Sequence, residues 1–131
     1  MDTKNGFTLL TPDEFASWLN SQNVTRTIFK VQLHHTASPS YSNFTGDNHF
    51  TLQTNMKNYH VNSRGFQDIA QHFTIFPDGK ICTGRSLNTN PAGITGGNTG
   101  AICIENLGWF DTGCDTMTEE QYESIIIAVR T

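Results

Sequence analysis

The chain has 131 residues, of which 36% are hydrophobic and 15% are charged, and its formal net charge is -4. This length predicts one domain with one modest core, and the composition is too apolar and too weakly charged for a disordered chain. The acidic balance argues against nucleic acid and against an anionic membrane surface as partners. No apolar run approaches the roughly 20 residues that a membrane-spanning helix needs.

Two features bear on the cellular compartment. Few apolar residues precede Pro12, so the core of a signal peptide is missing. We therefore expect synthesis in the cytoplasm, with lysis or non-classical export as the route to any target outside the cell. The cysteines Cys82, Cys103 and Cys114 are an odd number without CxxC spacing, which argues against a disulfide framework.

The first two predicted elements are a helix over residues 12–20 and a strand over residues 27–33. Thr11 and Glu14 have the spacing of a capping box, which is typical of a helix start. The strand is rich in β-branched and aromatic residues and leads directly into His34-His35-Thr36. These three residues are therefore predicted at the C-terminal end of a strand.

The next predicted element is a helix in the middle of the chain. Leu52, Met56 and Tyr59 lie at i, i+4 and i+7, which is the spacing of one inward-facing helical stripe. His49 and His60 lie in this helix or beside it, and we expect both to be surface residues.

Three strands are predicted after this helix. The turn Pro77-Asp78-Gly79 lies between strand-like residues 72–76 and 80–83, which predicts a β-hairpin. A buried strand is predicted over residues 101–107. Its one misfit is Glu105, a carboxylate in an otherwise apolar run.

The last predicted helix begins at Thr118 and has Tyr122, Ile125, Ile126 and Val129 as its apolar face. No glycine cap or proline stop follows the stripe. We therefore expect residues 1–131 to be a single domain that lacks its C-terminal segment, with its last helix cut short. An uncovered apolar face on this helix would favour a homodimer.

Two residues are candidates for chemistry. A histidine at the end of a rigid strand, as predicted for His34, suits a zinc ligand, although a hydrogen-bonded, half-buried histidine explains His34 or His35 equally well. Glu105 shares a strand face with Cys103, and burial there would raise its pKa towards the range of a general base. A salt-bridged or edge glutamate is the alternative. His72 begins a strand and is equally compatible with a structural histidine bonded to a backbone carbonyl.

Four sequence blocks together resemble the zinc-dependent N-acetylmuramoyl-L-alanine amidases of the type-2 family. Their common order is far more specific than any one block. The blocks are Leu33–Ala37, Gly65–Phe73, Asp78–Arg85 and Gly97–Gly108. The same fold is shared by peptidoglycan recognition proteins, phage endolysins and bacterial autolysins. The resemblance covers nearly the whole chain and implies an α/β fold with a mixed central sheet flanked by helices.

The resemblance also implies an activity, namely cleavage of the amide bond between N-acetylmuramic acid and L-alanine of peptidoglycan by zinc-activated water. It implies His34 as a zinc ligand and Glu105 as the catalytic residue that moves the proton of water to the leaving amine. Gln71 stands where some members carry a tyrosine, which favours Glu105. The remaining Zn²⁺ ligands are expected beyond Thr131, and the loop over residues 90–100 is expected to line an open groove.

A second class of function is compatible with the same residues. A non-catalytic peptidoglycan-binding module would keep the groove and lack the metal. Metal content separates the two hypotheses, because catalytic zinc needs three protein ligands and an open water position.

Overall fold

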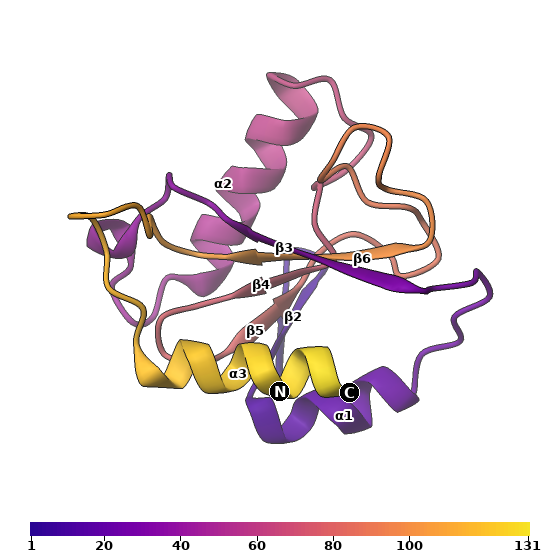
Figure 1. The fold of residues 1–131 in the computed structure, drawn as a ribbon, viewed down its shortest axis with the longest axis horizontal. Coiled ribbons are helices and arrows are strands. Elements are labelled where there is room, and N and C mark those ends of the chain that lie inside the picture. The colour runs from indigo at the N-terminus through magenta and orange to yellow at the C-terminus, as the bar shows by residue number, and fades with distance from the viewer.

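The chain folds into a six-stranded mixed sheet with helices on both faces, as the computed structural model of all 131 residues shows (Figure 1). The strands are β1 (Asp2–Lys4), β2 (Phe7–Leu10), β3 (Lys30–His35), β4 (Phe73–Ile75), β5 (Ile81–Thr83) and β6 (Ala101–Asn106). The helices are α1 (Pro12–Asn20), α2 (His49–Asn62) and α3 (Glu119–Arg130), and residues Tyr41–Asn43 form a short 3-10 helix. The predicted α/β fold with a mixed central sheet is confirmed. No helix contains an apolar segment of the length that a transmembrane span requires.

The strand order is β1-β2-β5-β4-β6-β3. The pairs β3–β6 and β4–β6 are parallel, whereas β1, β2, β5 and β4 pair in antiparallel fashion. The ladder of β3 begins at Lys30, opposite Ala101, so this strand starts three residues later than predicted. Its last residues are His34 and His35, as the sequence indicates.

An N-terminal hairpin of β1 and β2 is absent from the elements predicted above. Asn5 and Gly6 connect the strands with φ angles of 55° and 82°. Asn-Gly is the dipeptide that most favours a two-residue hairpin turn, because both positions need a positive φ. The signal was therefore present in the sequence, but β1 is short and exposed and has no apolar alternation to reveal it.

The core has two parts because both faces of the sheet are covered, by α2 on one side and by α1 and α3 on the other (Figure 1). Under α2, Leu52 and Met56 pack with Phe76 and other buried residues. On the opposite face, Phe15 of α1 packs edge-on against Phe73, with ring centroids 5.1 Å apart. Tyr59 is 56% exposed, so the predicted inward stripe of α2 is wrong at that position.

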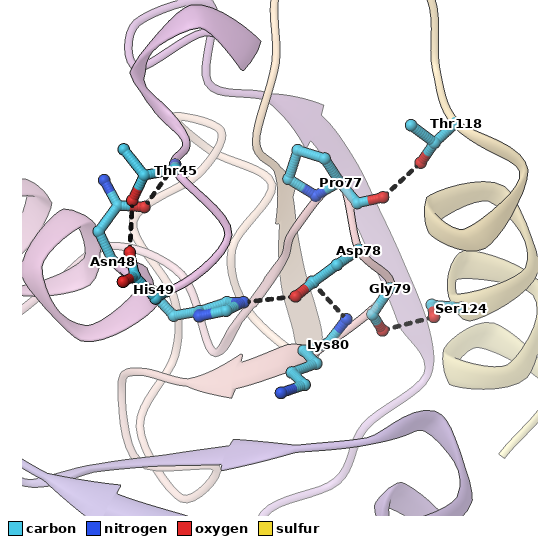
Figure 2. Close-up of polar contacts among 10 residues, drawn as sticks. Thr45, Asn48, His49, Pro77, Asp78, Gly79, Lys80, Thr118 and Ser124 are labelled. Atoms are coloured by element: carbon cyan, nitrogen blue, oxygen red, sulfur yellow. Dashed lines mark hydrogen bonds and ion pairs between the residues drawn. The ribbon is translucent and has the colours of Figure 1, made fainter.

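The turn between β4 and β5 is tied to α2 (Figure 2). His49 Nε2 lies 2.7 Å from Asp78 Oδ2, and the Lys80 N–H donates to Asp78 Oδ1 at 3.1 Å. His49 is 3% exposed, and its ring packs against the rings of Phe44 and Phe76. The expectation of a surface histidine is therefore wrong at His49, because the carboxylate of Asp78 gives the buried imidazole its partner.

Helix α3 faces the sheet with small and polar residues. Gln121 and Ser124 are fully buried, whereas Tyr122 and Val129 are 58% and 46% exposed, so the predicted apolar face is wrong at both ends. Gln121 Nε2 donates to two backbone carbonyls, and Ser124 Oγ donates to the Gly79 carbonyl at 2.6 Å (Figure 2). Hydrogen bonds to the end of β4, to the turn after it and to the residue after β6 thus position this face, and hydrophobic periodicity cannot detect them.

Candidate functional site

The two residues singled out for chemistry lie next to each other in the sheet. In the parallel ladder of β3 and β6, His34 is the register partner of Glu105. Register partners project their side chains to the same face of a sheet. Glu105 lines a pocket together with Leu52 and Met56 of α2, so this is the face that α2 covers.

This pocket has a volume of about 770 Å³ and is lined by 17 residues. Such a volume is typical of a ligand site. Its walls come from α2, from the ends of β3 and β6, and from the loops that follow β3, α2 and β5. The predicted contribution of the glycine-rich loop 90–100 is confirmed at Ala92 and Gly93.

The carboxyl group of Glu105 is partly buried and has no hydrogen-bonding or charged partner that offsets its burial. Burial raises the pKa of Glu105 to about 7, because the charged form loses its hydration. The alternative of a salt-bridged glutamate therefore does not apply. A carboxyl group that titrates near neutral pH in a pocket has the properties of a general base.

His34 does not line the pocket itself. Its Nε2 is buried without a hydrogen-bond partner. A Cβ atom added to Gly93 would lie 3.0 Å from His34 Nε2 and 2.9 Å from Cys103 Sγ, so the backbone at Gly93 packs directly over these two groups. His34 thus has a free nitrogen beneath the loop that forms one wall of the pocket.

The possible metal ligands in residues 1–131 do not by themselves form a site for a catalytic zinc ion. Nowhere in residues 1–131 do three or more His, Cys, Asp or Glu side chains come together as a metal site. His34 Nε2 is one free nitrogen donor, and burial raises the pKa of the Cys103 thiol to about 12, which disfavours the thiolate that zinc prefers. Zinc binding therefore stays a prediction from the family resemblance.

His35 does line the pocket and is more exposed than His34. Its Nδ1 accepts a hydrogen bond from the Phe110 N–H at 3.2 Å, and the two rings stack with centroids 6.2 Å apart. This contact orients the His35 ring at the pocket edge.

Helix α2 and the loop after it supply pocket residues to which the sequence analysis gave no functional role. His60, expected at the surface, is only partly exposed and lines the pocket. His60 Nδ1 accepts from the Ala70 N–H at 3.0 Å, and burial, followed by the charges of Arg64 and Arg85, lowers the pKa of His60. The neutral ring therefore carries its proton on Nε2 and is a donor. The Arg64 guanidinium lies over the Phe66 ring at 5.1 Å. In the sequence, the i, i+4 spacing of Met56 and His60 was the available signal that both residues lie on the same face of α2 and line the pocket.

Two further side chains support the loops around the pocket. Arg85 donates to the backbone carbonyls of Asp68, Ile69 and Asn90, which fixes the segments on either side of the pocket. His72 Nε2 lies 2.8 Å from the Thr89 carbonyl, while its Nδ1 accepts from the backbone N–H of Cys103. Burial lowers the pKa of His72 to about 4. The reading of His72 as a structural histidine is confirmed.

Known proteins share both the sequence and the fold. The N-acetylmuramoyl-L-alanine amidase family matches residues 24–131. Peptidoglycan-recognition protein SC2 of Drosophila melanogaster is 36% identical over 89 residues, which cover 68% of this chain and 46% of the relative. Peptidoglycan-recognition protein 2 of Holotrichia diomphalia is 33% identical over 82 residues, or 63% of this chain and 43% of the relative. The chain thus spans about half the length of these curated relatives.

Solved structures show the same fold at lower identity. Drosophila PGRP-LB superposes with a TM-score of 0.71 at 24% identity, covering 83% of this chain and 62% of that one. The ectodomain complex of peptidoglycan recognition proteins LCa and LCx, solved with bound tracheal cytotoxin, matches with a TM-score of 0.69 at 24% identity, covering 83% and 65%. At this level of identity, the likeness describes the fold alone.

Proposed function

Since the chain belongs to the N-acetylmuramoyl-L-alanine amidase family, we propose that it binds muramyl peptides of peptidoglycan in the pocket under α2 and supplies the base for their hydrolysis. The scissile bond is the amide between N-acetylmuramic acid and L-alanine of the stem peptide. Tracheal cytotoxin in a structural relative supports a ligand of this class. Access to the cell wall by lysis or non-classical export is part of the same proposal.

The observation that carries the proposal is the position of Glu105. It lies in the pocket wall, and its pKa of about 7 leaves a large fraction of the group ionised at neutral pH. The ionised carboxylate removes a proton from the attacking water while the new C–O bond forms. The same proton then passes to the nitrogen of L-alanine as the C–N bond breaks.

The pocket lining suits a ligand that is part sugar and part peptide. His60 and Arg64 present hydrogen-bond donors, while Tyr59 presents an exposed aromatic ring. Amide carbonyls and carboxylates of a stem peptide match these donors, and sugar rings pack against aromatic side chains. The mixture is less apolar than a typical pocket for a small hydrophobic ligand.

Binding without hydrolysis is the second candidate function. The specific observation in its favour is that residues 1–131 contain no group of three or more His, Cys, Asp or Glu side chains that could hold a metal ion. A muramyl-peptide receptor would use the same pocket and leave Glu105 without a catalytic role.

One paired experiment tests the proposal. Wild-type chain and Glu105→Gln are compared for binding of N-acetylmuramoyl-L-alanyl-D-isoglutamine by calorimetry and for release of its dipeptide by mass spectrometry. Binding by both proteins and release by wild type alone is the expected result. Release should increase about tenfold per pH unit below the pKa of Glu105 and level off above it, because only the ionised form acts as a base. Binding by both without release identifies the receptor function, and no binding by either refutes the proposal.

A further inference from the structure

Three buried polar side chains beside the pocket are connected by hydrogen bonds. Gln53 of α2, Thr74 of β4 and Gln71, which lies just before β4, are each 0% exposed. Gln53 Nε2 donates to the Thr83 carbonyl at 3.1 Å. Thr74 Oγ1 donates to Gln53 Oε1 at 2.7 Å, and Gln71 Nε2 donates to Thr74 Oγ1 at 3.0 Å. The three side chains therefore form one connected series.

The direction of every hydrogen bond in this series is fixed from one end. The backbone oxygen of Thr83 only accepts, so Gln53 must present its amino group there and its oxygen to Thr74. The single hydroxyl hydrogen of Thr74 is thereby used, and Thr74 Oγ1 must accept from Gln71. An exchange of the oxygen and nitrogen positions in the Gln71 amide would break this last bond.

With these directions fixed, the side-chain oxygen of Gln71 has no hydrogen-bond donor. Gln71 Oε1 is buried and has no hydrogen-bond partner, although Gln71 lines the pocket. An unpaired buried acceptor destabilises the folded protein. Gln71 cannot relieve this by rotating its amide, because the series from Thr83 holds the amide in place. A partner that arrives with the ligand would satisfy the atom.

We propose that Gln71 Oε1 accepts a hydrogen bond from an amide N–H of the muramyl peptide bound in the pocket, and so selects ligands with a secondary amide at that point. The inference rests on the proposed function. An ester or an N-alkylated amide has no hydrogen to donate there and would leave the acceptor unpaired. Sites built around such an acceptor discriminate strongly against analogues that lack the donor.

N-acetylmuramoyl-L-alanyl-D-isoglutamine offers three N–H groups of this kind. One belongs to L-alanine in the scissile amide, one to D-isoglutamine in the next peptide bond and one to the acetamido group of the sugar. All three are secondary amides and present the same chemistry to Gln71. Analogues that remove one hydrogen at a time distinguish them.

The test measures affinity in a Glu105→Gln host, so that the ligand is not cleaved. The ligands are N-acetylmuramoyl-L-alanyl-D-isoglutamine, its N-methyl-alanine analogue, its N-methyl-isoglutamine analogue and its analogue with an acetoxy group in place of the acetamido group. We expect one analogue to bind about tenfold more weakly than the parent. The analogue that has the reduced affinity identifies the N–H group that donates to Gln71.

The added substitution Gln71→Met keeps the length of the side chain and removes the acceptor. It should weaken the parent ligand about tenfold and abolish the difference between the parent and the sensitive analogue. The matched variant Gln53→Met breaks the anchored end of the series, where both polar atoms are bonded. It should lower the melting temperature more than Gln71→Met does, because the Gln71 side chain loses only its hydrogen bond to Thr74 Oγ1 and a weak one to Met56 Sδ at 3.7 Å.

Equal affinity for all four ligands in the Glu105→Gln host, which retains Gln71, overturns the inference, and this comparison does not depend on the folding of any Gln71 variant. A preference between parent and analogue that persists in Gln71→Met also overturns it. Failure of the parent ligand to bind at all refutes the proposed function and this inference together. Loss of affinity confined to one analogue and abolished by Gln71→Met supports both.

Discussion

Thr74 and Glu105 are register partners in the parallel ladder of β4 and β6. The buried hydrogen-bond series through Thr74 and the candidate base thus lie on neighbouring strands and share one face of the sheet. Both are held by backbone ladders rather than by a mobile loop. A site supported in this way keeps its geometry as the ligand enters.

The free energy of unfolding should become pH-dependent through Glu105. Burial raises its folded-state pKa from 4.5 to about 7, so the folded chain binds the proton more tightly than the unfolded chain. Wild type therefore loses stability as the pH rises between these values. Glu105→Gln should be more stable than wild type at pH 8, by up to about 3 kcal/mol, and no more stable at pH 4. Urea titrations at both pH values measure the difference; equal stability at pH 8 would contradict the buried position of Glu105.

Removal of divalent metal should leave the stability of residues 1–131 unchanged. His34 is not joined by two further donors in this chain, and binding of a structural metal normally adds to folding free energy. We expect the melting temperature in EDTA to match that in added zinc. Elemental analysis of wild type and His34→Ala provides the control. Stoichiometric zinc that is lost in His34→Ala would show that other donors reach His34.

The contact between His49 and Asp78 should contribute measurably to stability. Asp78→Ala leaves the buried His49 Nε2 without its partner and should cost about 2 kcal/mol. Burial acts to raise the pKa of Asp78, but hydrogen bonds from His49 and Lys80 outweigh it and lower the pKa below 3.8. The contribution of the carboxylate is therefore present above that value and lost as the pH falls through the folded-state pKa.

The control for this prediction is Asp2→Ala, since Asp2 is exposed at the start of β1. Urea denaturation at pH 7 and at pH 3 separates the two variants. A loss from Asp78→Ala that stays the same at both pH values would mean that shape, rather than charge, determines the contact.

A side chain at position 93 should disturb the pocket wall. A Cβ on Gly93 would collide with Gln32 Oε1 and approach Cys103 Sγ and His34 Nε2. Gly93→Ala should therefore cost about 1–3 kcal/mol and weaken ligand binding as the loop is displaced. Gly97→Ala is the matched control, because its Cβ would lie 3.2 Å from the flexible side chain of Ile94. Similar melting temperatures for both variants would refute the close packing at Gly93.

Thiol reactivity should differ sharply among the three free cysteines. Cys82 and Cys103 are buried, and burial raises the pKa of each thiol to about 12. Cys114 is exposed. Titration of the native chain with a disulfide reagent should modify Cys114 alone, and all three thiols should react in denaturant. Rapid modification of Cys103 would indicate that the loop over it opens readily.

Local signals in the sequence determined much of the fold. Thr11 and Glu14 form the predicted capping box at the start of α1, because a cap involves only residues within one turn. The turn at Pro77-Asp78-Gly79 connects β4 and β5 as predicted, because turn chemistry is also local. The position of Glu105 in a buried strand was likewise visible as a charge in an apolar run.

Tertiary structure alone decided which polar residues are buried and what satisfies them. His49 and Gln121 look like surface residues in the sequence, because their partners lie at least 29 and 14 positions away. The partner of Gln71 is Thr74, which is near in the sequence but is itself bonded to Gln53, 21 positions away on α2. Hydrophobic periodicity measures the preference of a side chain for water and does not register a hydrogen bond across the fold. The unpaired oxygen of Gln71 follows only from the complete series of contacts back to the Thr83 carbonyl, so the sequence determined the elements and the packing determined the chemistry of the pocket.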